Sequence, residues 1–103
     1  MTAEQLAAKS IDFRAALEFA ARAQARIDRL EAIAAEGMIL DQAQRDALSS
    51  AIATFDRELG FALDVARRNG VDFVVVPLPT CDLCYALENG RWEGFVSRVQ
   101  VAS

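Results

Sequence analysis

From Thr2 to Glu36 the chain contains neither proline nor glycine, and this uninterrupted run constrains the fold more than any other feature. Thr2 and Gln5 have the spacing of a capping box, in which each side chain satisfies a backbone amide of the first helical turn. Gly37 follows the run at the position where helices often end in a left-handed residue. The sequence therefore predicts one long helix over residues 3–36.

One face of this predicted helix is apolar, with members that recur every seven positions. A seven-residue apolar repeat on a helix indicates left-handed supercoiling against a partner helix. The apolar face consists of Leu6, Phe13, Leu17, Ala20, Ile27, Leu30 and Ala34. The opposite face is a charged ladder of Arg14, Glu18, Arg22 and Arg26, which we expect to be exposed to solvent.

A second helix is predicted after a short connection. Asp41 and Gln44 repeat the capping-box spacing, and Asn69 followed by Gly70 is typical of a helix end. Because the connection is short, the two helices should be antiparallel neighbours. The predicted buried stripe of the second helix is Leu48, Ile52, Phe55, Leu59, Leu63 and Ala66.

Phe61 and Val65 lie well away from that stripe, so the second helix is apolar on another face near its C-terminal end. An apolar helix face in a globular protein is normally covered. We expect the chain's own β-region to cover it, and the alternative is a partner subunit. Phe61 and Val65 are therefore candidate binding residues.

The last third of the chain has the pattern of β-strands. Val71–Val76 is a β-branched run that ends at Pro77, which predicts a strand. Asn89-Gly90 predicts a two-residue hairpin, because a type I′ turn needs positive φ at both central residues. In that hairpin Glu88 lies opposite Arg91.

The same register places Leu87 opposite Trp92 and gives the hairpin one apolar face, formed by Leu83, Tyr85, Leu87, Trp92 and Val96. Val99 and Val101 have the opposite parity, so we expect a bulge at Gly94. Tyr85 and Trp92 are a candidate aromatic binding platform. The favoured interpretation is that they pack against the helices, because the chain has few large side chains.

These elements predict an α+β fold in a single domain over residues 1–103. A long antiparallel two-helix hairpin over residues 3–69 precedes a small, about three-stranded antiparallel β-sheet within residues 71–102. Such a hairpin is longer than the sheet, so part of its apolar surface would remain uncovered. We expect a second copy of the chain to bury that surface in a homodimer through the hairpins.

The composition excludes several kinds of chemistry. The chain has no histidine, which removes Ser–His and Cys–His pairs and the commonest metal ligand. Its five glycines are scattered singly, so no phosphate-binding loop is present, and no cofactor is expected.

The net charge of −4 and the lack of a basic segment argue against direct nucleic-acid binding. No apolar run reaches membrane-spanning length, and the first residues lack a signal-peptide pattern, so we expect a cytoplasmic protein.

Cys81 and Cys84 form a Cys-x-x-Cys motif, which has four interpretations. A thiol–disulfide site would need Asp82–Asn89 to form a short helix after the preceding strand. A zinc site with four cysteine ligands would need a second copy to supply the other two thiolates. The cysteines can also be small buried hydrophobic residues or a regulatory thiol. The sequence favours packing, since the motif lacks a βαβ context and further ligands.

The sequence therefore predicts a non-enzymatic protein–protein interaction module, namely an adaptor, an assembly factor or a small protein inhibitor. Small accessory proteins of phages and mobile elements often have such features, although no residue pattern here indicates that origin. The alternative is a Cys-x-x-Cys thiol–disulfide oxidoreductase or a dimeric zinc protein with four cysteine ligands. The candidate binding residues are Phe61, Val65, Trp92 and Tyr85, and the candidate metal or redox residues are Cys81 and Cys84.

Overall fold

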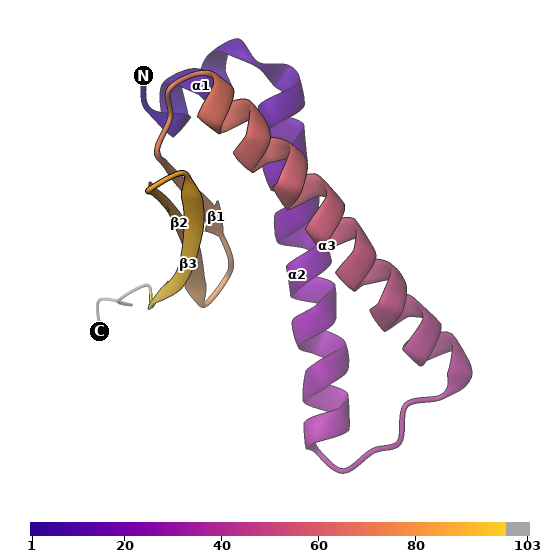
Figure 1. Cartoon of the computed structure of the whole chain (residues 1–103). Helices are drawn as coiled ribbons and strands as arrows, with labels where there is room; N and C mark the ends of the chain where they lie inside the picture. The colour runs from indigo at the N-terminus through magenta and orange to yellow at the C-terminus, as the bar shows by residue number, and fades with distance from the viewer. Residues whose placement is uncertain (99–103) are drawn as a thin grey trace.

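The computed structural model describes residues 1–98, in which helices are followed by an antiparallel sheet (Figure 1). The short helix α1 (Ala3–Lys9) leads into α2 (Ile11–Ala35), and α3 (Gln42–Arg68) runs back along α2. The strands β1 (Phe73–Pro77) and β2 (Cys81–Glu88) come next. The α+β class, the helical hairpin and the sheet that follows it are confirmed.

Local signals set the helix ends as predicted. The Thr2 hydroxyl accepts a hydrogen bond from the Gln5 amide at 3.2 Å, and the Gln5 side chain accepts one from the Thr2 amide at 2.8 Å. Asp41 and Gln44 form the same reciprocal pair at the start of α3. Gly37 ends the first long helix with φ of +84°, a backbone conformation that costs glycine little.

The predicted single helix over residues 3–36 is wrong at Ser10, where the chain leaves the helical conformation. Ser10 has φ of −118° and ψ of 108°, and its hydroxyl accepts a hydrogen bond from the Phe13 amide at 3.2 Å. Serine favours this N-cap position because its side chain replaces a missing intrahelical partner. The resulting bend brings Leu6 of α1 onto the same buried cluster as Phe13 of α2, and that packing stabilises the break.

The sheet is a meander in the order β1-β2-β3, completed by β3 (Arg91–Arg98). Asn89 and Gly90 have φ of 52° and 76°, as the predicted type I′ turn requires. The pairing of Glu88 with Arg91 and the adjoining pair in the same register are confirmed.

The predicted bulge at Gly94 is wrong, because β2 and β3 pair without interruption along the whole of β3 and Gly94 lies opposite Tyr85. A Cβ atom at Gly94 would lie 2.9 Å from Cε1 of the Tyr85 ring. Glycine is therefore needed here for the close approach of an aromatic ring and not for a change of register. Val99 and Val101, which motivated the bulge, lie outside the described residues.

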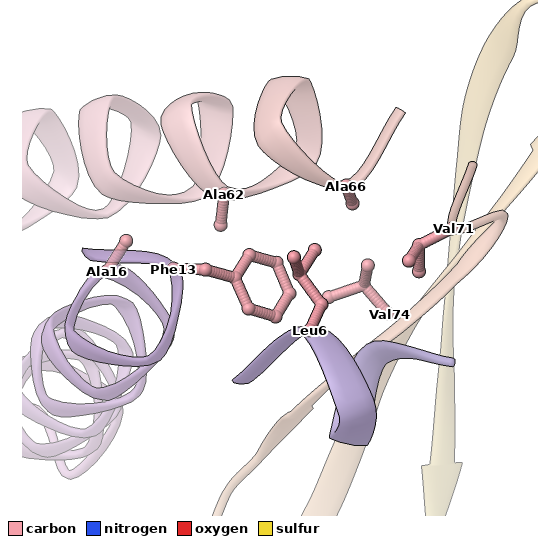
Figure 2. Packing of buried hydrophobic residues seen from close by; sticks show 7 residues of the cluster. All are labelled: Leu6, Phe13, Ala16, Ala62, Ala66, Val71 and Val74. Carbon is pink, nitrogen blue, oxygen red and sulfur yellow. The ribbon is translucent and has the colours of Figure 1, made fainter. Parts of the chain in front are cut away.

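Phe13 is at the centre of the main buried cluster, and its side chain has no exposed surface. Its ring lies between Leu6 of α1 and Ala62 of α3 (Figure 2). The members of this cluster are Leu6, Phe13, Ala16, Ala62, Ala66, Val71 and Val74. All three helices and the start of the β-region therefore meet around one aromatic side chain.

The contact between α2 and α3 is built largely from alanine. We call the buried residues Ala16, Ala20, Ala23, Ala51, Ala62 and Ala66 the alanine seam. Small side chains let two helix backbones approach closely. On α2 the buried positions alternate at spacings of three and four, which is the predicted seven-residue repeat, and they are Phe13, Ala16, Ala20, Ala23, Ile27 and Leu30.

The predicted stripes are correct in part. Phe13, Ala20, Ile27 and Leu30 of α2, with Leu59 and Ala66 of α3, are buried as expected. Leu17, Leu48, Phe55 and Leu63 are half-buried. Ala34 is exposed because it lies near the end of α2, where the two helices separate (Figure 1). Ile52 is also exposed, since Ala51 takes the buried position beside it.

A second buried cluster joins the sheet to the hairpin. It consists of Ala20, Leu59, Val76 and Leu78, with half-buried side chains of β2 packed against it. The sheet lies beside the part of the hairpin nearest α1, and the rest of the hairpin extends beyond it (Figure 1). The sheet therefore covers one side of the hairpin over only part of its length.

The central position of Phe13 leads to a stability prediction with a matched control in the same helix. Phe13→Ala should lower the free energy of unfolding by about 3–5 kcal/mol, because it leaves a cavity in a closely packed cluster. Phe19→Ala, at a side chain that is 48 % exposed, should cost less than about 1 kcal/mol. Urea unfolding followed by circular dichroism measures both, and equal midpoints would contradict the assigned core.

Gly94 and Gly60 provide a second prediction with opposite signs. Gly94→Ala should destabilise the protein by about 1–3 kcal/mol, because the new methyl group displaces the packed Tyr85 ring. Gly60→Ala has open space on the surface of α3 and should stabilise the protein by about 0.5–1 kcal/mol through helix propensity. Thermal unfolding of both variants tests this, and a neutral Gly94→Ala would show that the Tyr85 ring moves freely.

Candidate interaction surface

The hairpin has one side that the sheet covers and one side that it does not. On the covered side, Leu17 and Leu63 pack against the clusters shared with the sheet. On the other side Phe19 of α2 is 48 % exposed and Phe61 of α3 is 44 % exposed. Both rings line the same hollow, whose remaining lining residues are Asp12, Ala15, Ala16, Arg57 and Glu58. We call this the phenylalanine hollow.

The helix geometry explains why the two rings line the same hollow. Each residue turns about 100° around a helix, so a residue next to a seam alanine lies at the flank of the seam. Phe19 precedes Ala20, and Phe61 precedes Ala62, so each ring lies at the flank of its helix. Ala15 and Ala16 line the same hollow, and their small side chains fill little of it.

A second hollow continues from Phe19 along the same side of the hairpin. Its basic lining residues are Arg22, Arg26 and Arg29, whose spacing of four and three keeps them on one face of α2. Its other lining residues are Phe19, Ala23, Ala25, Ser50, Ala51 and Thr54. We call it the arginine groove, and we call the groove and the phenylalanine hollow together the hairpin face.

The arginine groove is electropositive on a chain whose net charge is −4. Among the side chains that the structure describes, the ion pairs are Arg57 with Glu58, at 3.6 Å, and Arg68 with Asp64. The three groove arginines take part in neither pair. The Arg22 guanidinium lies 5.9 Å from the centroid of the Phe19 ring, which is within range of a cation–π contact. The sequence placed Arg22 and Arg26 in an exposed charged ladder, but it did not predict that they line a groove with Arg29 beside Phe19.

The structure does not bring the four predicted binding residues into one surface. Val65 and Trp92 are half-buried against the cluster around Phe13, and Tyr85 packs against the second cluster. Phe61 remains exposed, so the expectation that the β-region covers this helix face is wrong for Phe61, whereas Val65 packs against a cluster that includes residues of the β-region. Phe19 was not singled out from the sequence, although its place beside a seam residue is a signal that could have identified it.

The two cysteines lie on opposite faces of a strand. Both belong to β2, in which alternate side chains point to opposite faces, and residues three apart therefore diverge. Cys81 packs on the helix-facing side against the second cluster, and Cys84 is buried on the other face with 5 % exposure. The thiol–disulfide interpretation required a helix over Asp82–Asn89, and the structure has a strand there instead.

The surroundings of Cys84 make its thiol a poor nucleophile. In the sheet register Val75 and Phe95 lie beside Cys84 on the neighbouring strands. The ring centroids of Phe95 and Phe73, on the same face of the sheet, are 6.2 Å apart. Burial raises the pKa of the Cys84 thiol, and the negative charge of Asp82 raises it further. Because the thiolate is the reactive species, these effects support the packing interpretation.

The divergence of the cysteines also bears on metal binding. Within residues 1–98, no three or more cysteine and carboxylate side chains gather closely enough to hold a metal ion. A zinc site shared by two chains stays a prediction, and it would require both thiols of each chain to reach one ion from opposite faces of β2.

A further hollow lies between α1 and the outer edge of β1. Its polar lining includes Thr2, Glu4 and Asp72, and its apolar lining includes Leu17 and Val75. The Thr2 hydroxyl already accepts the capping hydrogen bond of α1. The other residues that line the hollow are apolar, among them Ala3, Ala7 and Val71.

Comparisons with protein-family models, with curated proteins and with solved structures find no match. In the part of the chain that the structure covers, no helix is both long and apolar enough to cross a membrane.

The position of Cys84 leads to a reactivity prediction. Native Cys84 should react with iodoacetamide about tenfold more slowly than Cys81 at pH 8, because its raised pKa and burial reduce the accessible thiolate. The rate should rise as the pH is raised toward the shifted pKa, and the difference between the two cysteines should vanish in urea. Peptide mass spectrometry after timed alkylation measures both rates, with Cys84→Ala as the assignment control. Equal native rates would contradict the burial of Cys84.

Proposed function

We propose that this chain is a non-enzymatic protein–protein interaction module that binds its partner through the hairpin face. This proposal is based on Phe19 and Phe61, one from each long helix. Both side chains are about half exposed, and they line one hollow together with Ala15 and Ala16. Large aromatic anchors beside a hollow are the features that dominate protein interfaces energetically. An adaptor, an assembly factor or a small protein inhibitor would each use such a surface.

The energetics of the hairpin face favour binding. Complete burial of an exposed phenylalanine side chain contributes about 1.5–3 kcal/mol of favourable free energy. Because Phe19 and Phe61 are about half exposed, a partner that covers either one gains roughly half of that free energy. The helices that carry them are fixed by the alanine seam, so a partner would not have to order this surface. A helix or an extended segment that inserts one apolar side chain between the rings would follow the helix-in-groove mode of recognition.

The alternative functions based on the cysteines have less support. A dithiol oxidoreductase needs a reactive first thiol and a second thiol within reach of it. Here the two side chains lie on opposite faces of β2, and the pKa of Cys84 is raised, which is opposite to the shift that activates a catalytic thiol.

The proposal predicts unequal effects of two equally exposed phenylalanines. The binding partner is first identified by affinity capture from the native host and then purified. Phe61→Ala should weaken its binding about 30-fold or more, the loss expected when an interface anchor is truncated. Phe73→Ala on the outer face of the sheet, also at a side chain 44 % exposed, should change the affinity by less than about twofold.

Isothermal titration calorimetry gives both dissociation constants, and thermal unfolding verifies that each variant is folded. A larger loss for Phe73→Ala than for Phe61→Ala would assign the interface to the sheet and contradict the proposal.

A further inference from the structure

We propose that the hairpin face binds an acidic amphipathic segment of another protein. In this arrangement an apolar side chain of the segment enters the phenylalanine hollow, and its carboxylates pair with Arg22, Arg26 and Arg29 in the adjoining groove. This inference rests on the proposed function and adds the chemistry of the partner.

The charge of the groove identifies the ligand as an anion. Three guanidinium groups line one groove, none of its described lining residues is acidic, and the groove arginines take no part in the ion pairs found among the described side chains. Guanidinium groups bind carboxylates through paired, charge-assisted hydrogen bonds, which are stronger than neutral ones. The like charges at Arg22 and Arg26 also repel each other in the free protein, and an acidic ligand would relieve that repulsion.

The spacing of the arginines sets the spacing of the acidic groups. At a rise of 1.5 Å per residue, Arg22 and Arg29 are separated by about 10 Å along α2. A helical segment with acidic residues at positions i, i+4 and i+7 presents its carboxylates over the same length. Phe19 lines both hollows, so the apolar anchor of the segment lies directly beside its acidic stretch.

Two other occupants fit the groove less well. A nucleic acid would extend its phosphates beyond three arginines onto a chain with 15 acidic and 11 basic residues, where they would be repelled. A second copy of the chain would offer Asp12 and Glu58 from its own phenylalanine hollow, and Glu58 is already paired with Arg57. Neither supplies a compact set of carboxylates to match the three arginines.

Selection from a random peptide library tests the inference without a known partner. A phage-displayed library of peptides about 16 residues long is selected on the whole protein and depleted on Phe61→Ala, so that peptides depending on the phenylalanine hollow remain. The surviving peptides should be enriched in Asp and Glu at a spacing of three and four residues beside a large apolar residue. Their binding should weaken at least about tenfold when the salt concentration is raised from about 50 to about 500 mM, because exposed charge pairs are screened.

Charge reversal provides the matched control. The double variant Arg22→Glu/Arg26→Glu should weaken the selected peptides at least about tenfold, and selection on it should enrich Lys and Arg instead. Arg14→Glu, at an exposed arginine on the same helix that does not line the groove, should change affinity less than about twofold. Equal losses from Arg14→Glu and from either groove substitution alone would overturn the inference, because the effect would then be one of overall charge.

The outcomes separate the inference from the proposed function. Peptides that depend on Phe61 but show no acidic enrichment would overturn the acidic partner and leave the interaction surface intact. A library that yields no Phe61-dependent peptide would contradict both proposals. Sedimentation of the free protein supports the inference if the species has the 11.2 kDa mass of one chain. A species of twice that mass that Phe61→Ala dissociates would assign the face to a second copy and overturn the inference.

Discussion

The close contact between α2 and α3 along the alanine seam positions every other element of the fold. Because Ala16 and Ala62 are small, the two helix backbones approach closely, and the single large ring of Phe13 fills the space where α1 reaches them. Val71 and Val74 complete the same cluster, so the position of the sheet is set by the helices beneath it. Among the described residues no polar or charged side chain is buried, so the side-chain contacts between these layers are apolar packing.

Three of the seam alanines also line the candidate interaction surface, Ala16 in the phenylalanine hollow and Ala23 and Ala51 in the arginine groove. Leucines at these positions would fill the hollow and the groove, whereas alanines leave space beside the rings of Phe19 and Phe61. The use of alanine therefore has two effects: the helices pack closely against each other, and a hollow remains on the surface of the hairpin. The sheet covers only the opposite side of the hairpin, so the side chains of Phe19 and Phe61 stay about half exposed.

The cysteine pair illustrates how backbone conformation decides the chemistry of a motif. In a helix, residues three apart lie on one face, and two thiols at that spacing can act together. In β2 the same spacing separates Cys81 and Cys84 onto opposite faces. The sequence favoured packing over redox or metal chemistry from the lack of further ligands, and the strand supplies a geometric reason for the same preference.

Several elements could be predicted because they depend on local interactions: the capping boxes at Thr2 and Asp41, the turn at Asn89 and the strand register that follows from it. These features need only neighbouring residues and backbone φ angles, so the order of residues specifies them directly. Contacts made in the folded chain set the break at Ser10, the ring over Gly94 and the gathering of arginines beside Phe19. The break at Ser10 also needs Leu6 to pack beside Phe13, the close ring needs β2 to pair with β3, and the exposure of the arginines depends on which helix flank the sheet leaves uncovered. The periodicity of a single helix encodes none of these.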